Sequence, residues 1–167
     1  MKNIAEEEFD VTPMKLQKLL YYCQGYSLAL TGKPMFNEEI EAWSYGPVVP
    51  SVYQEYKACG RCCIPFESVG DEHDVDSVDA SIAQLVVREK GCMSGIALAK
   101  MTHREAPWLN AYEGKYTNCT ISRESIKAFF DDVLQQTELY EEDEDNLWLS
   151  VGEPMSCEDW EELLAKV

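Results

Sequence analysis

The sequence predicts a mainly α-helical single domain with a short β element and an acidic C-terminal extension. Apolar residues recur at steps of three and four over several stretches, which is the period of a helix face. One short stretch instead alternates apolar and polar residues, as a strand does. The chain has 167 residues with 46% hydrophobic content, enough to bury one core. We therefore expect an N-terminal lead-in (1–11), a compact domain (12–140) and an acidic extension with a short helix (141–167).

The first predicted helix begins at Thr12-Pro13. A threonine hydroxyl can accept a free N–H at a helix N-terminus, and the fixed φ of proline suits the first helical position. Gly32 and Pro34 then end the helix. One apolar face is predicted to be buried, and it consists of Leu16, Leu19, Leu20, Cys23, Tyr26 and Leu30.

The next elements are predicted to be short. Residues 40–45 alternate apolar and polar side chains and predict a strand that ends at Gly46-Pro47. An amphipathic helix follows and closes at Gly60. Residues 61–77 have no sustained period and predict a loop, with an extended piece at 63–66. The short helix is predicted from Val49, Val52, Tyr53 and Tyr56.

Three further helices are predicted from their caps and apolar faces. The first begins near Ser77 or Asp79 and ends at Gly91, the second begins at Ser94, and the third begins at Ser122. Their apolar faces consist of Ile82, Leu85 and Val86, of Leu98 and Met101, and of Ile126, Phe129, Phe130, Val133 and Leu134.

The negative charge is concentrated near the C-terminal end. The chain has 14 Lys and Arg against 31 Asp and Glu, a net charge of -17 at pH 7, and residues 131–167 hold 12 of the 17 excess charges. This balance disfavours binding to nucleic acid or to an anionic membrane, because both need Lys and Arg to meet phosphates. Within this region residues 147–151 predict a strand, and Ser156 begins a last short helix with Trp160, Leu163 and Leu164.

The first ten residues have no apolar run and no basic start, so we expect no export signal. No apolar stretch approaches the ~20 residues that span a bilayer. The seven cysteines are an odd number and predict reduced thiols. A cytoplasmic location follows from these three expectations.

No motif predicts catalysis, a metal or a cofactor. A cysteine nucleophile would need a base, but no motif pairs a cysteine with His73 or His103. A zinc site at Cys59, Cys62 and Cys63 with His73 lacks the second Cys-x-x-Cys or His pair that would make it specific, and the simpler interpretation is a cysteine-rich turn. We expect no catalytic residue, metal or cofactor, with a Cys–His hydrolase and a zinc-binding protein as alternatives.

Residues 103–108 combine a histidine, an arginine, a proline that blocks continuation of the preceding helix, and a tryptophan. Arg and Trp dominate the hot spots of protein interfaces. In the alternative interpretation, Trp108 lies in the core and His103 and Arg104 hydrogen-bond the last carbonyls of the preceding helix. The sequence leaves both interpretations open.

Three stretches occur in a specific order: TPMKLQKLLYYCQGY (12–26), IEAWSYGPVVPSVY (40–53) and THREAPW (102–108). Together they resemble the Panacea domain, the family of SocA-like antitoxins and of many prophage-encoded proteins. The similarity runs from about Thr12 to Leu134. The loop at 59–63 and the chain after Tyr140 lie outside the family pattern.

The resemblance implies a noncatalytic, mostly helical antitoxin that neutralises a toxin encoded by the adjacent gene. It also implies, for the SocA type, delivery of the toxin to a cytoplasmic protease. The alternative is a prophage accessory or adaptor protein that binds a host factor and has no toxin.

Two surfaces are candidates for partner binding. The first is carried over from the family motif, with support of the fold as its alternative role. It consists of Tyr45, Gly46, Pro47, His103, Arg104, Pro107 and Trp108. The second is an acidic run with one aromatic anchor, for which a solvated charge run is the alternative. It consists of Glu141, Glu142, Asp143, Glu144, Asp145 and Trp148.

Overall fold

The computed structural model describes residues 10–65, 76–114 and 119–142, with side chains as far as residue 136. The fold of these residues is mainly helical with a small antiparallel sheet, as predicted. The strand predicted at 147–151 and the helix predicted from Ser156 lie outside them. In chain order the elements are α1 (Pro13–Thr31), β1 (Ile40–Trp43), β2 (Gly46–Val48), α2 (Pro50–Tyr56), the 3-10 helix η1 (Lys57–Cys59), α3 (Ser77–Lys90), α4 (Gly95–Thr102), α5 (Ala106–Ala111), β3 (Cys119–Ile121) and α6 (Arg123–Glu142).

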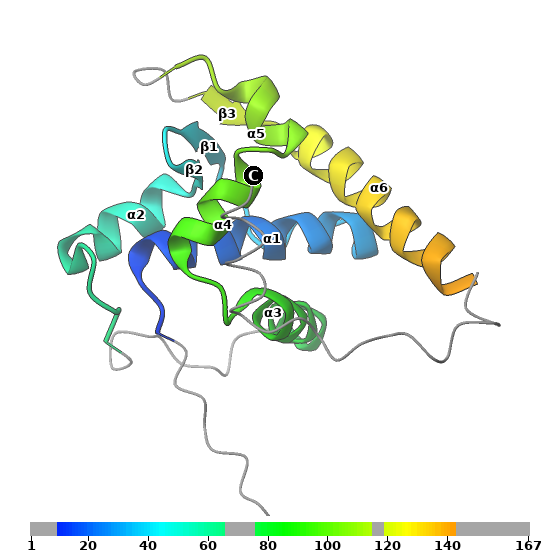
Figure 1. Cartoon of the computed structure of the whole chain (residues 1–167), viewed down its shortest axis with the longest axis horizontal. Helices are drawn as coiled ribbons and strands as arrows, with labels where there is room; N and C mark the ends of the chain where they lie inside the picture. The colour runs from blue at the N-terminus through cyan, green and yellow to red at the C-terminus, as the bar shows by residue number, and fades with distance from the viewer. Residues whose placement is uncertain (1–9, 66–75, 115–118, 143–167) are drawn as a thin grey trace, which may run out of the picture.

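Helix α1 is the centre of the fold, with α3, α4 and α6 packed around it (Figure 1). It begins as predicted, because the Thr12 hydroxyl accepts a hydrogen bond from the Lys15 N–H at 3.3 Å. It ends as predicted at Gly32, which has φ +72°.

The prediction of one buried face on α1 is wrong. Side chains are buried on all sides of the helix, including Gln17, Lys18 and Gln24, whereas Leu30 at its end is 52% exposed. The cause is the position of α1, because helices and strands pack on several of its sides and leave no continuous solvent face.

An aromatic cluster joins α1 to α6. The Phe130 ring makes edge-on contacts with Tyr21, Tyr22 and Tyr26, with ring centroids 5.1–6.0 Å apart. A Cβ atom at Gly25 would overlap the ring of Phe130. Glycine at this position therefore allows α6 to approach α1 closely.

The three strands form an antiparallel sheet in the order β2-β1-β3. Strand β1 was predicted, but β2 and β3 were not. Gly46-Pro47 does not end the β structure as expected, because Gly46 pairs with Trp43 and Pro47 with Ala42. Strand β2 lies at the edge of the sheet, where proline is tolerated.

The other helix starts agree with the predictions in most cases. Ser94 caps α4, and the Ser122 hydroxyl accepts from the Ser125 N–H at the start of α6. The cap of α3 is Asp76, one residue before the expected range. Helix α5 was not predicted: Pro107 lies in its first turn and begins a new helix.

Between η1 and α3 the structure describes residues 60–65 and Asp76. Helix α2 and η1 close at Gly60, as predicted. Residues 63–65 form no strand, although the Ile64 N–H donates to the Val11 carbonyl at 2.9 Å. This bond ties the loop to the start of α1.

Candidate functional site

The second and third family stretches meet at the turn between β1 and β2. The indole N–H of Trp108 donates to the carbonyl of Trp43 at 2.9 Å, and the Tyr112 hydroxyl donates to Oγ of Ser44 at 3.4 Å. Ser44 and Tyr45 form the turn between the two strands. These bonds hold α5 and the residue that follows it against the hairpin.

A stack of three rings lines this junction. The centroids of His103 and Trp108 are 4.3 Å apart, and those of Trp108 and Tyr112 are 4.5 Å apart with an interplanar angle of 17°. Trp108 is only 7% exposed, as the core interpretation of this residue expected. His103 and Arg104 do bond carbonyls of α4, through their backbone N–H groups, to Ala99 and Met101.

The first family stretch reaches the same place through Lys18, which the sequence analysis did not identify. Its Nζ is buried and donates to the carbonyl of Pro47 at 2.8 Å. Burial lowers the pKa of Lys18 to about 7. Lys18 is not part of the apolar face predicted for α1, so only the packing of the hairpin reveals it.

Gly46 allows this close approach. It has φ +97°, and a Cβ atom there would lie 2.6 Å from Oγ1 of Thr102 and 2.9 Å from Nζ of Lys18. The neighbouring strand is also fixed to α1, because the Val49 N–H donates to Oε1 of Gln17 at 2.7 Å.

His103 is half-buried beside Lys18. Its Nε2 atom is buried and makes no hydrogen bond to the described part of the chain. Burial, and then the charge of Lys18, lower the pKa of His103, and a hydrogen bond with the backbone of Ser44 partly opposes this. Burial and the charge of Lys18 thus both favour the neutral form of the ring.

Glu105 links the same segment to α1. Its Oε1 accepts from the Tyr22 hydroxyl at 2.7 Å. Burial raises the pKa of Glu105, while the hydroxyls of Tyr22 and Tyr21 and the charge of Lys90 oppose the shift. The Lys90 ammonium also lies 4.7 Å from the centroid of the Tyr22 ring. The buried carboxyl group of Glu105 thus anchors the partly exposed segment 103–108 to α1.

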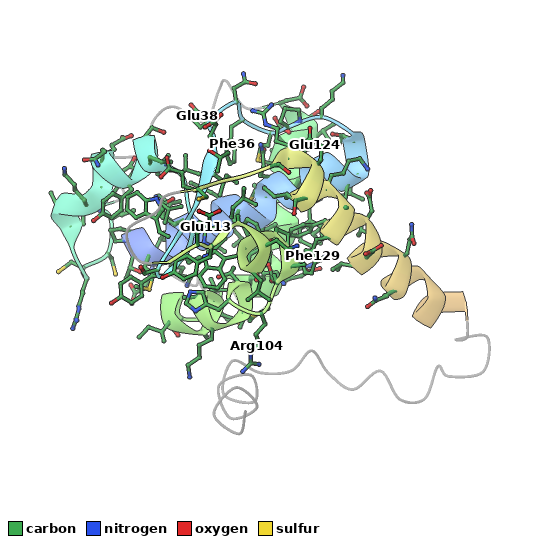
Figure 2. The ribbon with its side chains drawn as sticks, turned by 90° about the horizontal axis from the view of Figure 1, so that it is seen from above. Phe36, Glu38, Arg104, Glu113, Glu124 and Phe129 are labelled. Atoms are coloured by element: carbon green, nitrogen blue, oxygen red, sulfur yellow. The ribbon has the colours of Figure 1, made fainter. Side chains whose placement is uncertain are left out.

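The predicted motif residues divide into two sets. Tyr45 is 70% exposed, and Arg104 is exposed and projects outward from the body of the protein (Figure 2). Ser44 and His103 are joined by a hydrogen bond. Tyr45 follows Ser44 in the chain, and Arg104 follows His103. The remaining residues support these two. His103 is half-buried, and the buried members are Gly46, Pro47, Pro107 and Trp108.

The acidic candidate surface falls almost entirely outside the described residues. The backbone of α6 continues through Glu141 and Glu142, two residues beyond the expected domain boundary. Its C-terminal end reaches beyond the rest of the described fold (Figure 1). Asp143, Glu144, Asp145 and Trp148 are not described.

Within residues 10–65, 76–114 and 119–142, no three His, Cys, Asp or Glu side chains are grouped so that they could hold a metal ion. His73, the fourth ligand of the alternative zinc site, lies outside these ranges. No helix in the described part is both long and apolar enough to cross a membrane.

The fold and the site define a class of small, mainly helical proteins in which a buried polar and aromatic junction supports a few exposed side chains. The chain belongs to the family of SocA-like antitoxins with a Panacea domain. The family model described as "Antitoxin SocA-like, Panacea domain" matches residues 16–109. This confirms the resemblance, but the match ends before α6, short of the expected limit at Leu134.

A curated relative gives the same assignment. The protein named Antitoxin SocA, from Caulobacter vibrioides (strain NA1000 / CB15N), is 42% identical over 60 residues. This stretch covers 36% of the present chain and 32% of the relative. The match thus spans about a third of the length of that protein. No solved structure matches the chain.

Proposed function

We propose that this protein is an antitoxin that neutralises a partner toxin by direct, noncovalent contact. The observation that carries the proposal is the meeting of all three family stretches at the hairpin turn. Lys18 of the first stretch donates to Pro47 of the second at 2.8 Å, and Trp108 of the third stretch donates to Trp43 of the second at 2.9 Å. A binding surface needs this kind of firm support, because side chains that are already positioned lose less entropy when the partner binds.

Tyr45 and Arg104 are the residues of this surface that reach a partner. A tyrosine offers a large rigid contact area, and an arginine offers several directed donors, so both types are common in hot spots. We place these two at the centre of the interface. His103 and Trp108 act beneath them as support.

The charge of the chain favours a basic partner. Toxins that act on RNA or nucleotides need positive active surfaces, and a chain with net charge -17 would meet such a protein rapidly. The acidic run 141–145 with Trp148 is the second proposed contact. The toxin gene is expected beside the gene for this protein.

Co-expression with the neighbouring reading frame tests the proposal. We expect that product to arrest growth alone and to be harmless beside the wild-type chain. Tyr45→Ala and Arg104→Ala should each weaken binding of the purified partner about tenfold or more, which is the loss typical of a hot-spot residue.

Matched controls lie elsewhere on the surface. Leu30→Ala removes an exposed apolar side chain at the end of α1, and Arg88→Ala removes an exposed arginine from α3. Both should bind as the wild type does. A harmless neighbour, or equal losses in all four variants, would contradict the proposed surface.

Delivery to a protease is the competing mode that the resemblance implies. Neutralisation by purified proteins with no protease present would support direct inhibition. Neutralisation that fails in the purified system but occurs in cells would support delivery instead.

A further inference from the structure

The turn after η1 contains three thiols that the proposed antitoxin surface does not use. Cys59 is half-buried at the end of η1, and Cys62 and Cys63 are exposed. All three were expected as members of a cysteine-rich turn, with zinc as the alternative. They belong to no metal-binding group of the described residues. A disulfide, however, needs only two thiols that lie close together.

The backbone brings Cys59 and Cys62 together. The Cys62 N–H donates to the Cys59 carbonyl at 2.9 Å, which closes a four-residue turn. Gly60 has φ +59° and ψ -110°, near the values of about +60° and -120° for the first central residue of a type II′ turn. This conformation favours glycine, so the sequence Cys-Gly-Arg-Cys suits the turn.

The span of this turn matches that of a disulfide. The first and fourth Cα atoms of a β-turn lie within about 7 Å, and disulfides join Cα atoms about 4.4–6.8 Å apart. Little backbone movement is therefore needed to join Cys59 to Cys62.

Cys63 and the residue after it form hydrogen bonds with the segment that precedes α1. A hydrogen bond with Asp10 raises the pKa of its thiol, and the next residue, Ile64, is bonded to Val11. Cys63 is therefore held to the segment before α1, and it is not the residue that we pair with Cys59.

We propose that Cys59 and Cys62 form a redox-active dithiol that closes reversibly to an intramolecular disulfide. The oxidant is a low-molecular-weight disulfide such as oxidised glutathione. Cys62 is the attacking residue because it is the exposed member of the pair, and the half-buried Cys59 is the resolving residue.

The exchange takes place in two steps. The Cys62 thiolate attacks one sulfur of the small disulfide, forms a mixed disulfide and releases the first small thiolate. The Cys59 thiolate then attacks the Cys62 sulfur and releases the second. The protein loses two protons and two electrons, and the oxidant takes them up to become two small thiols.

The full-length chain is reduced, equilibrated with mixtures of reduced and oxidised glutathione, alkylated and digested with trypsin. Cleavage after Lys57 and Arg61 separates Cys59 from Cys62, so a closed disulfide joins two peptides that mass spectrometry identifies. We expect this linked pair as the main oxidised product of the turn. Reduced dithiothreitol should reverse it completely.

Three variants distinguish the pair from its neighbour. Cys63→Ser should form the Cys59–Cys62 disulfide as the wild type does. Cys59→Ser should instead retain glutathione on Cys62, and Cys62→Ser should form no intramolecular disulfide in this turn. Phenylarsine oxide, which bridges two near thiols, should bind this turn in the wild type and in Cys63→Ser only. Persistent glutathione on wild-type Cys62, or a disulfide that uses Cys63, would overturn the proposal.

Discussion

The burial and the pKa of Lys18 depend on residues that are distant in the sequence but pack against it. Lys18 lies on α1, outside the apolar face that the sequence predicts to be buried. In the folded protein its ammonium group is buried and donates to one carbonyl, that of Pro47. Burial without a negative partner destabilises the charged form, and this lowers its pKa to about 7.

Lys18→Met tests this description through the pH dependence of stability. The folded pKa of about 7 lies below the ordinary value of 10.5, so between pH 7 and 9 the unfolded chain holds a proton that the folded chain loses. The unfolding free energy of the wild type therefore gains a contribution that rises by about 2 kcal/mol over this range. The variant lacks this contribution.

The measurement is urea unfolding at pH 7, 8 and 9. The variant also leaves the Pro47 carbonyl without its donor, but that loss of about 1–3 kcal/mol does not change with pH. We expect the variant to become less stable relative to wild type as the pH rises. Lys100→Met, on the exposed side of α4, is the control and should follow the wild type. If the unfolding free energies of Lys18→Met and wild type change with pH in parallel, the lowered pKa of Lys18 is contradicted.

At the scale of elements, the sequence predicted what depends on local chemistry. Thr12, Ser94 and Ser122 cap helices because each hydroxyl meets an N–H only three residues away. Strand β3 has only three residues, too few to show a period, so it is recognised by its pairing with β1. Helix α5 was missed because Pro107 was interpreted as the end of one helix and not as the start of another.

The hairpin provides the element-scale prediction. Gly46→Ala places a Cβ atom against Thr102 and Lys18 and forces a positive φ on alanine, so we expect a loss of about 3 kcal/mol or more. Gly32→Ala also has a positive φ, but nothing lies within 4 Å, so its loss should be about 1 kcal/mol. Thermal unfolding of the two variants gives the comparison. Equal losses would contradict the close packing of the hairpin on α1.

At the scale of the whole molecule, the charge and the family match fall on different parts of the chain. The match covers 16–109, whereas 12 of the 17 excess negative charges lie in 131–167. The second and third motifs supplied the residues of the candidate site, but the contribution of the first, through Lys18, follows only from the packing. They did not predict that Tyr45 and Arg104 are exposed while Pro107 and Trp108 are buried, because exposure depends on how α5 packs against the hairpin.

Truncation after Tyr140 tests the role of the acidic extension. If residues 141–167 guide a basic partner, the truncated chain should associate with the toxin about tenfold more slowly at low salt, and the difference should shrink as salt screens the charge. Stopped-flow association at several salt concentrations measures this. A full-length chain in which residues 141–145 carry amides in place of carboxylates should behave as the truncation does. Unchanged association in both would remove the extension from the mechanism.

The most direct test of the central claim is a titration of the purified toxin with the purified, full-length chain, with toxin activity as the readout. Direct noncovalent neutralisation predicts a sharp loss of activity at a fixed stoichiometry, with no protease present, and full recovery of active toxin after denaturation and separation of the two chains. Inhibition by trace amounts that deepens with time, or intact toxin activity in the presence of excess chain, would contradict it.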